Sequence, residues 1–156
     1  MLGKLARKLR IFGFDTVYLS NIDDNHLIKL AINTKRNMLT KDKELFVRSL
    51  RLDIPCYLLI SENELDNFIS IFKKYKIKFI CPITNDFTRC TICNSKIQSI
   101  KKDELSLTLK EYIPKKVFDN NNKFYFCKRC SKIYWNGTHI QELNKLIDII
   151  NCKLNC

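Results

Sequence analysis

The sequence predicts an α/β protein in which a parallel sheet flanked by helices is followed by a small four-cysteine zinc ribbon. Over residues 2–76, segments with helical spacing alternate with short strand-like runs, which is typical of a parallel sheet covered by helices. Beyond residue 80 the alternation stops and two Cys-x-x-Cys pairs follow. We therefore expect an α/β domain over residues 1–80, the ribbon over 81–142 and a helical tail over 143–156.

Four segments of the α/β half carry apolar residues every three or four positions, the spacing of amphipathic helices. They cover residues 2–12, 20–35, 41–51 and 63–76. Gly13 follows the first segment and is a typical helix stop. We expect these helices to cover both faces of the sheet.

Short runs between these segments are predicted to be strands. Residues 14–19, "FDTVYL", are rich in β-branched and aromatic side chains. Residues 36–39, "RNML", are short enough for a buried strand, and residues 56–60, "CYLLI", suit a strand buried on both faces. In the second half, "FYF" at residues 124–126 is an expected strand, and residues 139–156 are an expected helix.

Charge is the most informative bulk property. The chain has 28 Lys and Arg against 16 Asp and Glu, a formal net charge of +12. This excess favours a polyanionic partner, nucleic acid ahead of an anionic membrane surface, although a lysine-rich composition alone would also produce it. No apolar stretch approaches the ~20 residues that span a bilayer, and the basic N-terminus lacks the apolar core of a signal peptide. We therefore expect a cytoplasmic protein.

Four of the eight cysteines form two pairs with the same spacing, Cys90-x-x-Cys93 and Cys127-x-x-Cys130. A two-residue gap lets one tight turn present both sulfurs to a single ion, and Zn²⁺ prefers four tetrahedral ligands. In a chain without a secretion signal, such spacing favours metal over disulfides. The sequence therefore predicts a structural Zn²⁺ site with no open position for chemistry. The alternative, four unrelated buried thiols, requires the repeated spacing to arise by chance.

Two acidic residues stand where predicted elements reach one edge of the sheet. Asp42 ends a predicted strand, and Asp24 starts the helix that follows the preceding strand. Ligands of open parallel sheets gather outside the carboxyl ends of the strands. Carboxylates there can hold Mg²⁺ or Mn²⁺, which would activate water and offset charge on a phosphate. The alternative role is helix capping, for which Asp is favoured, and one residue can serve both roles.

Three motifs in the first half, together with the cysteine pairs, resemble the Mut-seven carboxy-terminal RNase domain family, a branch of the PIN-like nucleases. The motifs are "MLGKLARKLRIFGFDT", "IDDNHLIKLA" and "NMLTKD", and the ribbon is "RCTICNSKI" with "CKRCSKIYWNGTH". The resemblance runs in the same order to about residue 142. It implies a PIN-like α/β domain with a C-terminal zinc ribbon.

The resemblance also implies metal-dependent cleavage of RNA by acids clustered at the sheet edge. Carried over to this sequence, that role falls on Asp24 and Asp42, with Asp23 and Glu44 as acidic neighbours. Relatives have a strand ending in Asp just before the "MLGKLAR" helix, whereas this sequence begins at that Met. The expected alternatives are a start that lies upstream or a site that has lost one acid.

Basic residues of the first half are expected to contact nucleic acid. Arg7 and Arg10 match the "LARxLR" helix of the family and would either bind phosphate or steady the acids. Lys4 lies in the same motif, and Lys41 lies in "NMLTKD" next to Asp42.

We expect a metal-dependent endoribonuclease with structural Zn²⁺ and catalytic Mg²⁺ or Mn²⁺. The alternative is an RNA-binding adaptor, in which the ribbon and basic helices grip the backbone and no bond is cut. RNA, and no membrane, is the expected partner, and the oligomeric state is left open.

Overall fold

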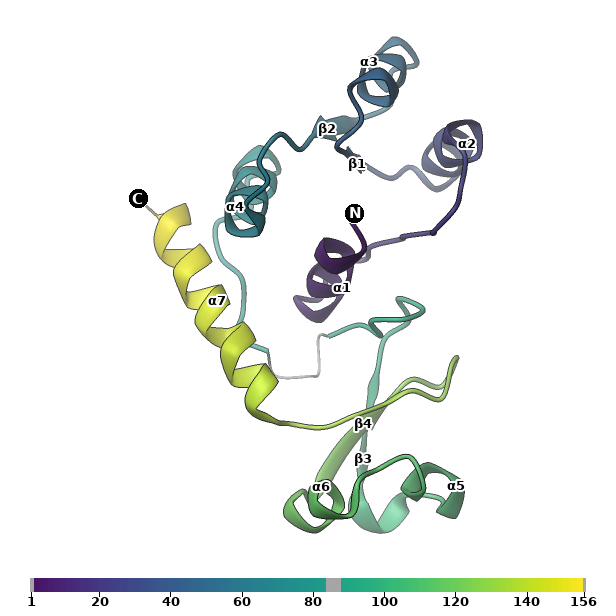
Figure 1. Ribbon diagram of the computed structural model, residues 1–156, viewed down its shortest axis with the longest axis vertical. Helices are drawn as coiled ribbons and strands as arrows, with labels where there is room; N and C mark the ends of the chain where they lie inside the picture. The colour runs from purple at the N-terminus through teal and green to yellow at the C-terminus, as the bar shows by residue number, and fades with distance from the viewer. Residues whose placement is uncertain (1, 84–87, 156) are drawn as a thin grey trace.

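The computed structural model describes residues 2–83 and 88–155 (Figure 1). The first half contains α1 (Gly3–Ile11), α2 (Asp24–Thr34), β1 (Met38–Thr40), α3 (Lys43–Arg51), β2 (Cys56–Leu58) and α4 (Glu64–Lys74). The second half contains β3 (Gln98–Lys101), the 3₁₀ helix η1 (Lys102–Glu104), α5 (Leu107–Lys110), α6 (Lys115–Asn120), β4 (Lys123–Phe126), β5 (Ile133–Tyr134) and α7 (Thr138–Leu154). This is an α/β protein with a parallel and an antiparallel sheet, as the sequence predicted in outline.

Local sequence signals account for where the first helices start and stop. Asp23, Asp42 and Asn63 cap the N-termini of α2, α3 and α4 by accepting backbone N–H groups on their side chains. After α1, Gly13 adopts φ 93°, a left-handed conformation that favours glycine, so the predicted helix stop is confirmed.

The parallel sheet has two strands in the described part of the chain, β1 and β2, with Met38 opposite Cys56 and Thr40 opposite Leu58. Met38 N–H donates to the Pro55 carbonyl and Leu59 N–H donates to the Thr40 carbonyl, both at 2.8 Å. Helices α2 and α3 pack beside this sheet around one small core, made of Ile28, Ala31, Met38, Leu45, Ile54 and Cys56. Strands are therefore confirmed within the two predicted segments, although β1 starts only at Met38 and β2 ends at Leu58. Burial of residues 56–60 on both faces is wrong, since Ile60 is 84% exposed.

The strand predicted at residues 14–19 is wrong. Polar side chains take the backbone groups that a neighbouring strand would need: Thr16 N–H donates to Asn94 Oδ1 at 3.0 Å, and the Asp15 carbonyl accepts from Arg36 at 3.0 Å. The segment instead borders an open groove of about 470 Å³ that is lined by parts of α1, α2, β1 and α4. Its β-branched and aromatic residues gave a local strand signal that these long-range contacts override.

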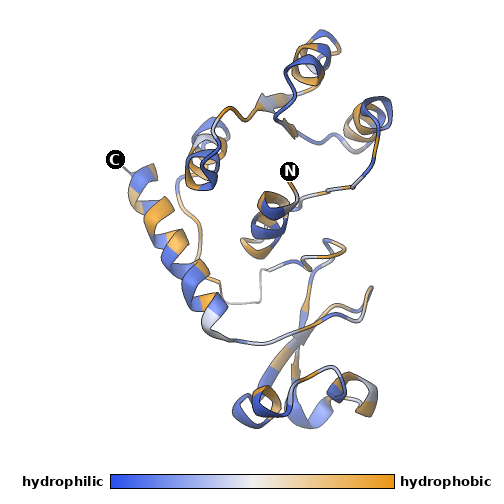
Figure 2. Ribbon diagram, in the orientation of Figure 1, coloured by the Kyte–Doolittle hydropathy of each residue, from blue (hydrophilic) through white to orange (hydrophobic). Residues whose placement is uncertain are grey.

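The main core joins the first half to the last helix. Phe68 and Phe72 of α4 and Ile147 and Ile150 of α7 are each fully buried in one apolar cluster, which also holds residues of α1. Apolar residues recur along both helices in Figure 2. Residues 143–154 of the expected tail thus share a core with the expected first domain. None of the helices in the described part of the chain combines the length and apolar character that crossing a membrane needs.

The second half is built on an antiparallel sheet in the order β3-β4-β5. The strand predicted at residues 124–126 lies within β4, whose Phe124 is fully buried. A small apolar cluster around Phe124 brings in side chains from α5 and α6, and a second one surrounds the cysteines at the other end of the sheet. These clusters are small, so the sheet has few apolar contacts of its own to stabilise it.

Candidate functional site

The four predicted zinc ligands converge on one point. The sulfur atoms of Cys90, Cys93, Cys127 and Cys130 all lie within 4.8 Å of one another. The closest separations are 3.3 Å between Cys93 and Cys127 and 3.4 Å between Cys90 and Cys130. Thiolates at ~2.3 Å from a tetrahedral Zn²⁺ lie roughly 3.8 Å apart, so this cluster is suited to hold one such ion.

The two cysteine turns have the same backbone pattern. The N–H of Cys90 donates to the Ser95 carbonyl, and the carbonyl of Cys90 accepts the N–H of Asn94. Cys127 is bonded in the same way to Lys132 and Ser131. Asn94 and Ser131 both have positive φ, 66° and 56°, immediately after the second cysteine of each pair. Each pair is therefore a tight knuckle that presents two sulfurs on one side.

Burial and contacts between the sulfurs shift the pKa values of thiols in this cluster in opposite directions. Burial raises the pKa of the Cys93 thiol, but hydrogen bonds from Ser95, Cys127 and Cys90 together outweigh burial and lower this pKa to about 6. Burial and the neighbouring sulfurs raise the pKa of Cys130 to about 12. Four sulfurs this close cannot all be thiolates without compensating charge, and a bound divalent ion supplies it.

Aromatic residues around the knuckles serve packing. Tyr125 is buried, and the hydroxyl of half-buried Tyr134 lies 3.1 Å from Cys90 Sγ and accepts the N–H of Thr91 at 3.1 Å. Burial, followed by the Cys90 contact, raises the pKa of Tyr134, so its hydroxyl keeps its proton at neutral pH.

Arg10 joins the α/β half to the first knuckle. Its guanidinium donates to the carbonyls of Thr91 at 2.7 Å, Ile92 at 3.1 Å and Thr16 at 2.8 Å, and the residue is 5% exposed. The backbone N–H of Arg89 donates in turn to the Arg10 carbonyl at 2.9 Å. These contacts correspond to neither expected role, phosphate binding or steadying the acids, because every described hydrogen bond of the guanidinium goes to the backbone of residues 16, 91 and 92. The guanidinium instead positions the first knuckle.

Asp42 caps helix α3 at the point where β1 ends. Its Oδ1 accepts the backbone N–H groups of Glu44 at 2.7 Å and Leu45 at 2.9 Å. Its Oδ2 makes no hydrogen bond or ion pair with the described residues. The carboxylate is exposed, so one oxygen serves the helix while the other faces solvent.

The other predicted acids are also exposed on helix starts. Asp23 caps α2, and its carboxylate accepts from the backbone and ring of His26, which lowers the pKa of Asp23. Asp24 and Glu44 lie in the first turns of α2 and α3, and neither carboxylate has a hydrogen-bond or ion-pair partner in the described part of the chain. A hydrogen bond from Arg48 to Asn25 joins α3 to the first turn of α2.

Two further acids lie at the carboxyl edge of the parallel sheet. Glu62 follows β2 and pairs with Lys41, which follows β1, at 3.0 Å. Glu64 begins α4 and pairs with Lys8 of α1. Neither glutamate was predicted as a site residue, although Glu62 follows a parallel strand just as Asp42 does. Lys41, expected to contact nucleic acid, is thus partly neutralised.

Lys4 and Arg7, the remaining basic residues expected to contact nucleic acid, are exposed, whereas Arg10 is buried. Lys4 and Arg7 are exposed on α1 and have no hydrogen-bond or ion-pair partner among the described residues. They are therefore accessible to a ligand. Within residues 2–83 and 88–155, the cysteines are the only group of three or more potential ligand side chains that lie close enough for one ion.

The fold and this cluster define an α/β protein with a four-cysteine metal-binding module. The chain matches the family model described as Mut7-C RNAse domain over residues 1–147, nearly its whole length, and it therefore belongs to that family. This confirms the resemblance drawn from the motifs and indicates a nuclease-like, RNA-related function. No curated protein and no solved structure matches the chain.

Proposed function

We propose that this protein is a metal-dependent ribonuclease with a PIN-like α/β half, and that Asp24 and Asp42 are its main catalytic acids. The observation that carries the proposal is the arrangement of Asp42 in a chain of this family: it follows β1 and keeps Oδ2 unpaired while Oδ1 caps α3. A capping residue can thus also serve as a ligand.

Neighbouring contacts support a site at this edge. Because β1 and β2 are parallel, the residues that follow them meet on one side, as the Lys41–Glu62 pair illustrates. The Arg48–Asn25 hydrogen bond ties the first turn of α2, which carries Asp24, to the last turn of α3, the helix that Asp42 caps at its other end. In this proposal Asp23 and Glu44 are acidic neighbours, and Lys4 and Arg7 supply exposed positive charge for the RNA backbone.

The proposed roles follow from the chemistry of each side chain. Exposed carboxylates of Asp24 and Asp42 are the oxygen ligands that Mg²⁺ and Mn²⁺ prefer. Such an ion, when bound, would activate water and neutralise charge on the scissile phosphate. The protein's own contribution is to hold these carboxylates on the rigid ends of two helices and to orient the RNA through basic side chains.

The test is cleavage of an end-labelled single-stranded RNA by the purified chain in Mn²⁺ or Mg²⁺. Asp24→Asn and Asp42→Asn should each lower the cleavage rate at least ~100-fold, since each removes a charged ligand while keeping side-chain size. Asp148→Asn on α7, an exposed acid far from the edge in sequence, is the matched control. Unchanged cleavage in both edge variants would rule out the assignment.

A second candidate function is RNA binding without cleavage. It is favoured by one observation: in the described part of the chain no three acids gather within reach of one ion, whereas the cysteines do. Salt-sensitive RNA binding with no cleavage in either metal would select this function.

A further inference from the structure

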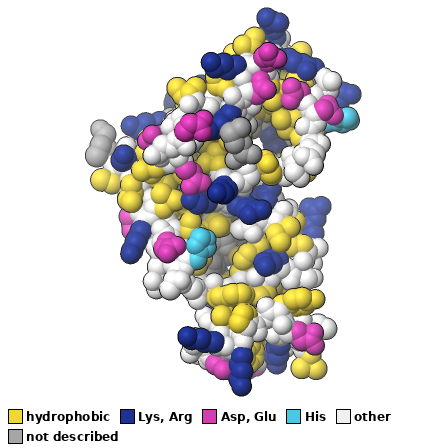
Figure 3. All heavy atoms as spheres, in the orientation of Figure 1, with side chains coloured by type: hydrophobic (Ala, Val, Ile, Leu, Met, Phe, Trp, Pro, Cys, Tyr) yellow, Lys and Arg dark blue, Asp and Glu magenta, His cyan; other side chains and the backbone are white. Residues whose placement is uncertain are grey.

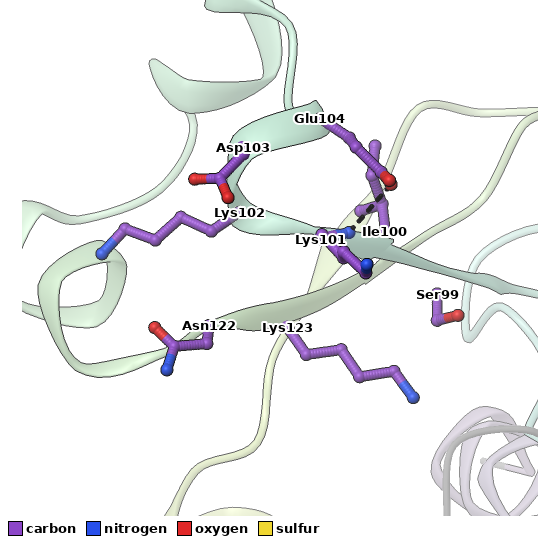
Figure 4. A pocket seen from close by; sticks show the side chains of 8 residues that line it. All are labelled: Ser99, Ile100, Lys101, Lys102, Asp103, Glu104, Asn122 and Lys123. Atoms are coloured by element: carbon purple, nitrogen blue, oxygen red, sulfur yellow. Dashed lines mark hydrogen bonds between the residues drawn. The ribbon is translucent and has the colours of Figure 1, made fainter.

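The zinc ribbon carries a hollow of about 640 Å³ where β3 ends, η1 follows and β4 begins (Figure 4). Three lysines line it, Lys101, Lys102 and Lys123, together with the polar residues Ser99 and Asn122. The hollow lies at the end of these strands away from the cysteine knuckles, since β4 runs from Lys123 toward Cys127. It is thus separate from both the metal cluster and the acidic edge.

Lys101 and Lys123 are direct partners across the antiparallel pair β3–β4, so their side chains leave the sheet on the same face. Like charges directly opposite each other destabilise a sheet by repulsion. Lys102 follows Lys101 directly, and its side chain points the other way, so its ammonium group lies on the opposite side of the strand pair (Figure 4). An anion placed between Lys101 and Lys123 would replace this repulsion with attraction, and a longer polyanion could also reach Lys102.

Within the described chain, these ammonium groups have no carboxylate at ion-pair distance. Glu104 lines the hollow, but its Oε2 accepts the backbone N–H of Lys101 at 3.2 Å. Asp103 also lines it and pairs with none of the lysines. None of the three lysines is therefore held in an ion pair, and the lining keeps a small net positive charge, three lysines against two carboxylates.

Aromatic rings position two of the charges. Lys102 Nζ lies 4.4 Å from the centre of the Phe118 ring, and Lys123 Nζ lies 5.3 Å from that of Tyr125. Rings attract an ammonium group without cancelling its charge. The Asn122 carbonyl accepts the Lys102 N–H at 3.1 Å and so fixes the two sides of the hollow to each other.

The surrounding ribbon is basic as well. Residues 96–132 contain ten Lys and Arg and four Asp and Glu, a difference of +6, which is half of the chain's +12. Figure 3 shows Lys and Arg side chains at the ribbon end of the molecule. A long polyanion passing the hollow would therefore meet further positive charge on either side.

We propose that this hollow binds the phosphate backbone of single-stranded RNA. The proposal rests on the RNA-related function proposed above and adds an anchoring surface distinct from the acidic edge. Lys101, Lys102 and Lys123 contact phosphates, and the hydroxyl of Ser99 and the amide of Asn122 donate hydrogen bonds to phosphate or sugar oxygens. Such contacts hold RNA without reading its bases.

The test is fluorescence anisotropy of a labelled single-stranded RNA with the zinc-loaded full chain, in buffer without Mg²⁺ or Mn²⁺ so that cleavage plays no part. The hollow variant is Lys101→Gln with Lys102→Gln and Lys123→Gln. The control variant is Lys73→Gln with Lys74→Gln and Lys78→Gln, three exposed lysines of α4 and the segment after it, which changes net charge equally. A third variant, with arginine at the three hollow positions, keeps the charge.

The hollow variant should bind RNA at least ~10-fold more weakly at 150 mM salt, and its salt slope should fall by about 2, since each lost contact removes ~0.7. The control and arginine variants should bind like the original chain. Equal loss in the hollow and control variants, no loss in the hollow variant, or no RNA binding by the original chain would each overturn the proposal. The proposal would also be overturned if the hollow variant lost binding to phosphatidylserine vesicles but kept its binding to RNA. A chain that binds RNA through the hollow but cleaves none would refute only the nuclease assignment.

Discussion

Arg10 in α1 donates a hydrogen bond to the carbonyl of Thr91, 81 residues further along the chain, at 2.7 Å. Thr91 stands between the first two cysteines of the metal cluster. The same guanidinium also holds Thr16 and Ile92, and its position near Cys90 and Cys93 offsets part of the cost of burying its charge. The metal module is thereby fixed to the helix that begins the α/β half.

Replacing Arg10 should therefore destabilise the whole chain. Arg10→Met leaves three carbonyls without their donor and should cost about 3 kcal/mol in the free energy of unfolding. Urea denaturation measures this cost. Arg7→Met, on the exposed side of the same helix, should stay within ~0.5 kcal/mol. Equal stability of the two variants would contradict a positioning role for Arg10.

Loss of one thiolate should unfold the ribbon. Cys127 is fully buried in the cluster, and Cys127→Ser should reduce bound Zn²⁺ from one per chain to a substoichiometric level, because metal binding and folding are coupled. Native mass spectrometry counts the ion. Cys152→Ser, at an exposed thiol outside the cluster, should leave it bound. Since the ligands must be deprotonated, bound metal should decrease as pH falls.

The two roles proposed for Asp42 can be separated by substitution. Asp42→Ala removes both the cap of α3 and the charge, and should cost about 1 kcal/mol of stability as well as activity. Asp42→Asn keeps an oxygen that can accept the backbone N–H groups, so stability should be nearly retained while cleavage is lost. Thermal unfolding and RNA cleavage measured on both variants test this. If Asp42→Asn still cleaved RNA, Asp42 would have only a helix-capping role and no catalytic one.

Asp15 should give the stability a defined pH dependence. Its hydrogen bond from Arg36, followed by that from Asn94, lowers the pKa of Asp15 in the folded chain. The carboxylate therefore stabilises the fold above its unfolded pKa of about 4, and this contribution is lost as pH falls through the lower folded value. Because the side chain is 45% exposed, Asp15→Asn should cost no more than ~1 kcal/mol at pH 7.

The difference between the original chain and Asp15→Asn, measured by urea denaturation, should shrink as the pH is lowered below about 4. The metal site is common to both chains, so its own acid sensitivity cancels in the difference. A difference that stays constant with pH would show that the carboxylate charge is not involved.

Helix α7 should be required for the stability of the first half. Ile147→Ala creates a cavity against α4 and should cost about 2–5 kcal/mol, since Ile147 is fully buried. Ile149→Ala, at a position 47% exposed, should change the free energy of unfolding by ~0.5 kcal/mol or less. Similar losses in both would mean that burial against α4 contributes little.

Features set by neighbouring residues could be predicted from the sequence. The spacing of apolar residues located α1 to α4, and the paired Cys-x-x-Cys motifs located the metal cluster, because a knuckle is a local turn. Caps such as Asp42 are also local and were recognisable as such. For these features the interactions that stabilise the structure lie within a few residues of one another.

Features set by distant residues could not be predicted in this way. Residues 14–19 look like a strand, but Asn94 and Arg36, far along the chain, take up their backbone groups. Arg10 looks like an exposed phosphate ligand in a basic helix, yet its partners are Thr91 and Ile92. The periodicity of apolar residues does not reveal which distant segments pack against each other, so these contacts could be identified only from the structure.

The packing of α7 on α4 has a consequence for how the chain is made. Ribosomes add about 5–20 residues per second, so the 63 residues between α4 and α7 (75–137) delay the start of α7 by roughly 3–13 s. During that interval Phe68 and Phe72 can pack against Phe12 and Phe14, but the side of these rings that α7 covers in the finished protein stays exposed. We expect the N-terminal half to depend on chaperones, and to risk aggregation, until translation reaches its final helix.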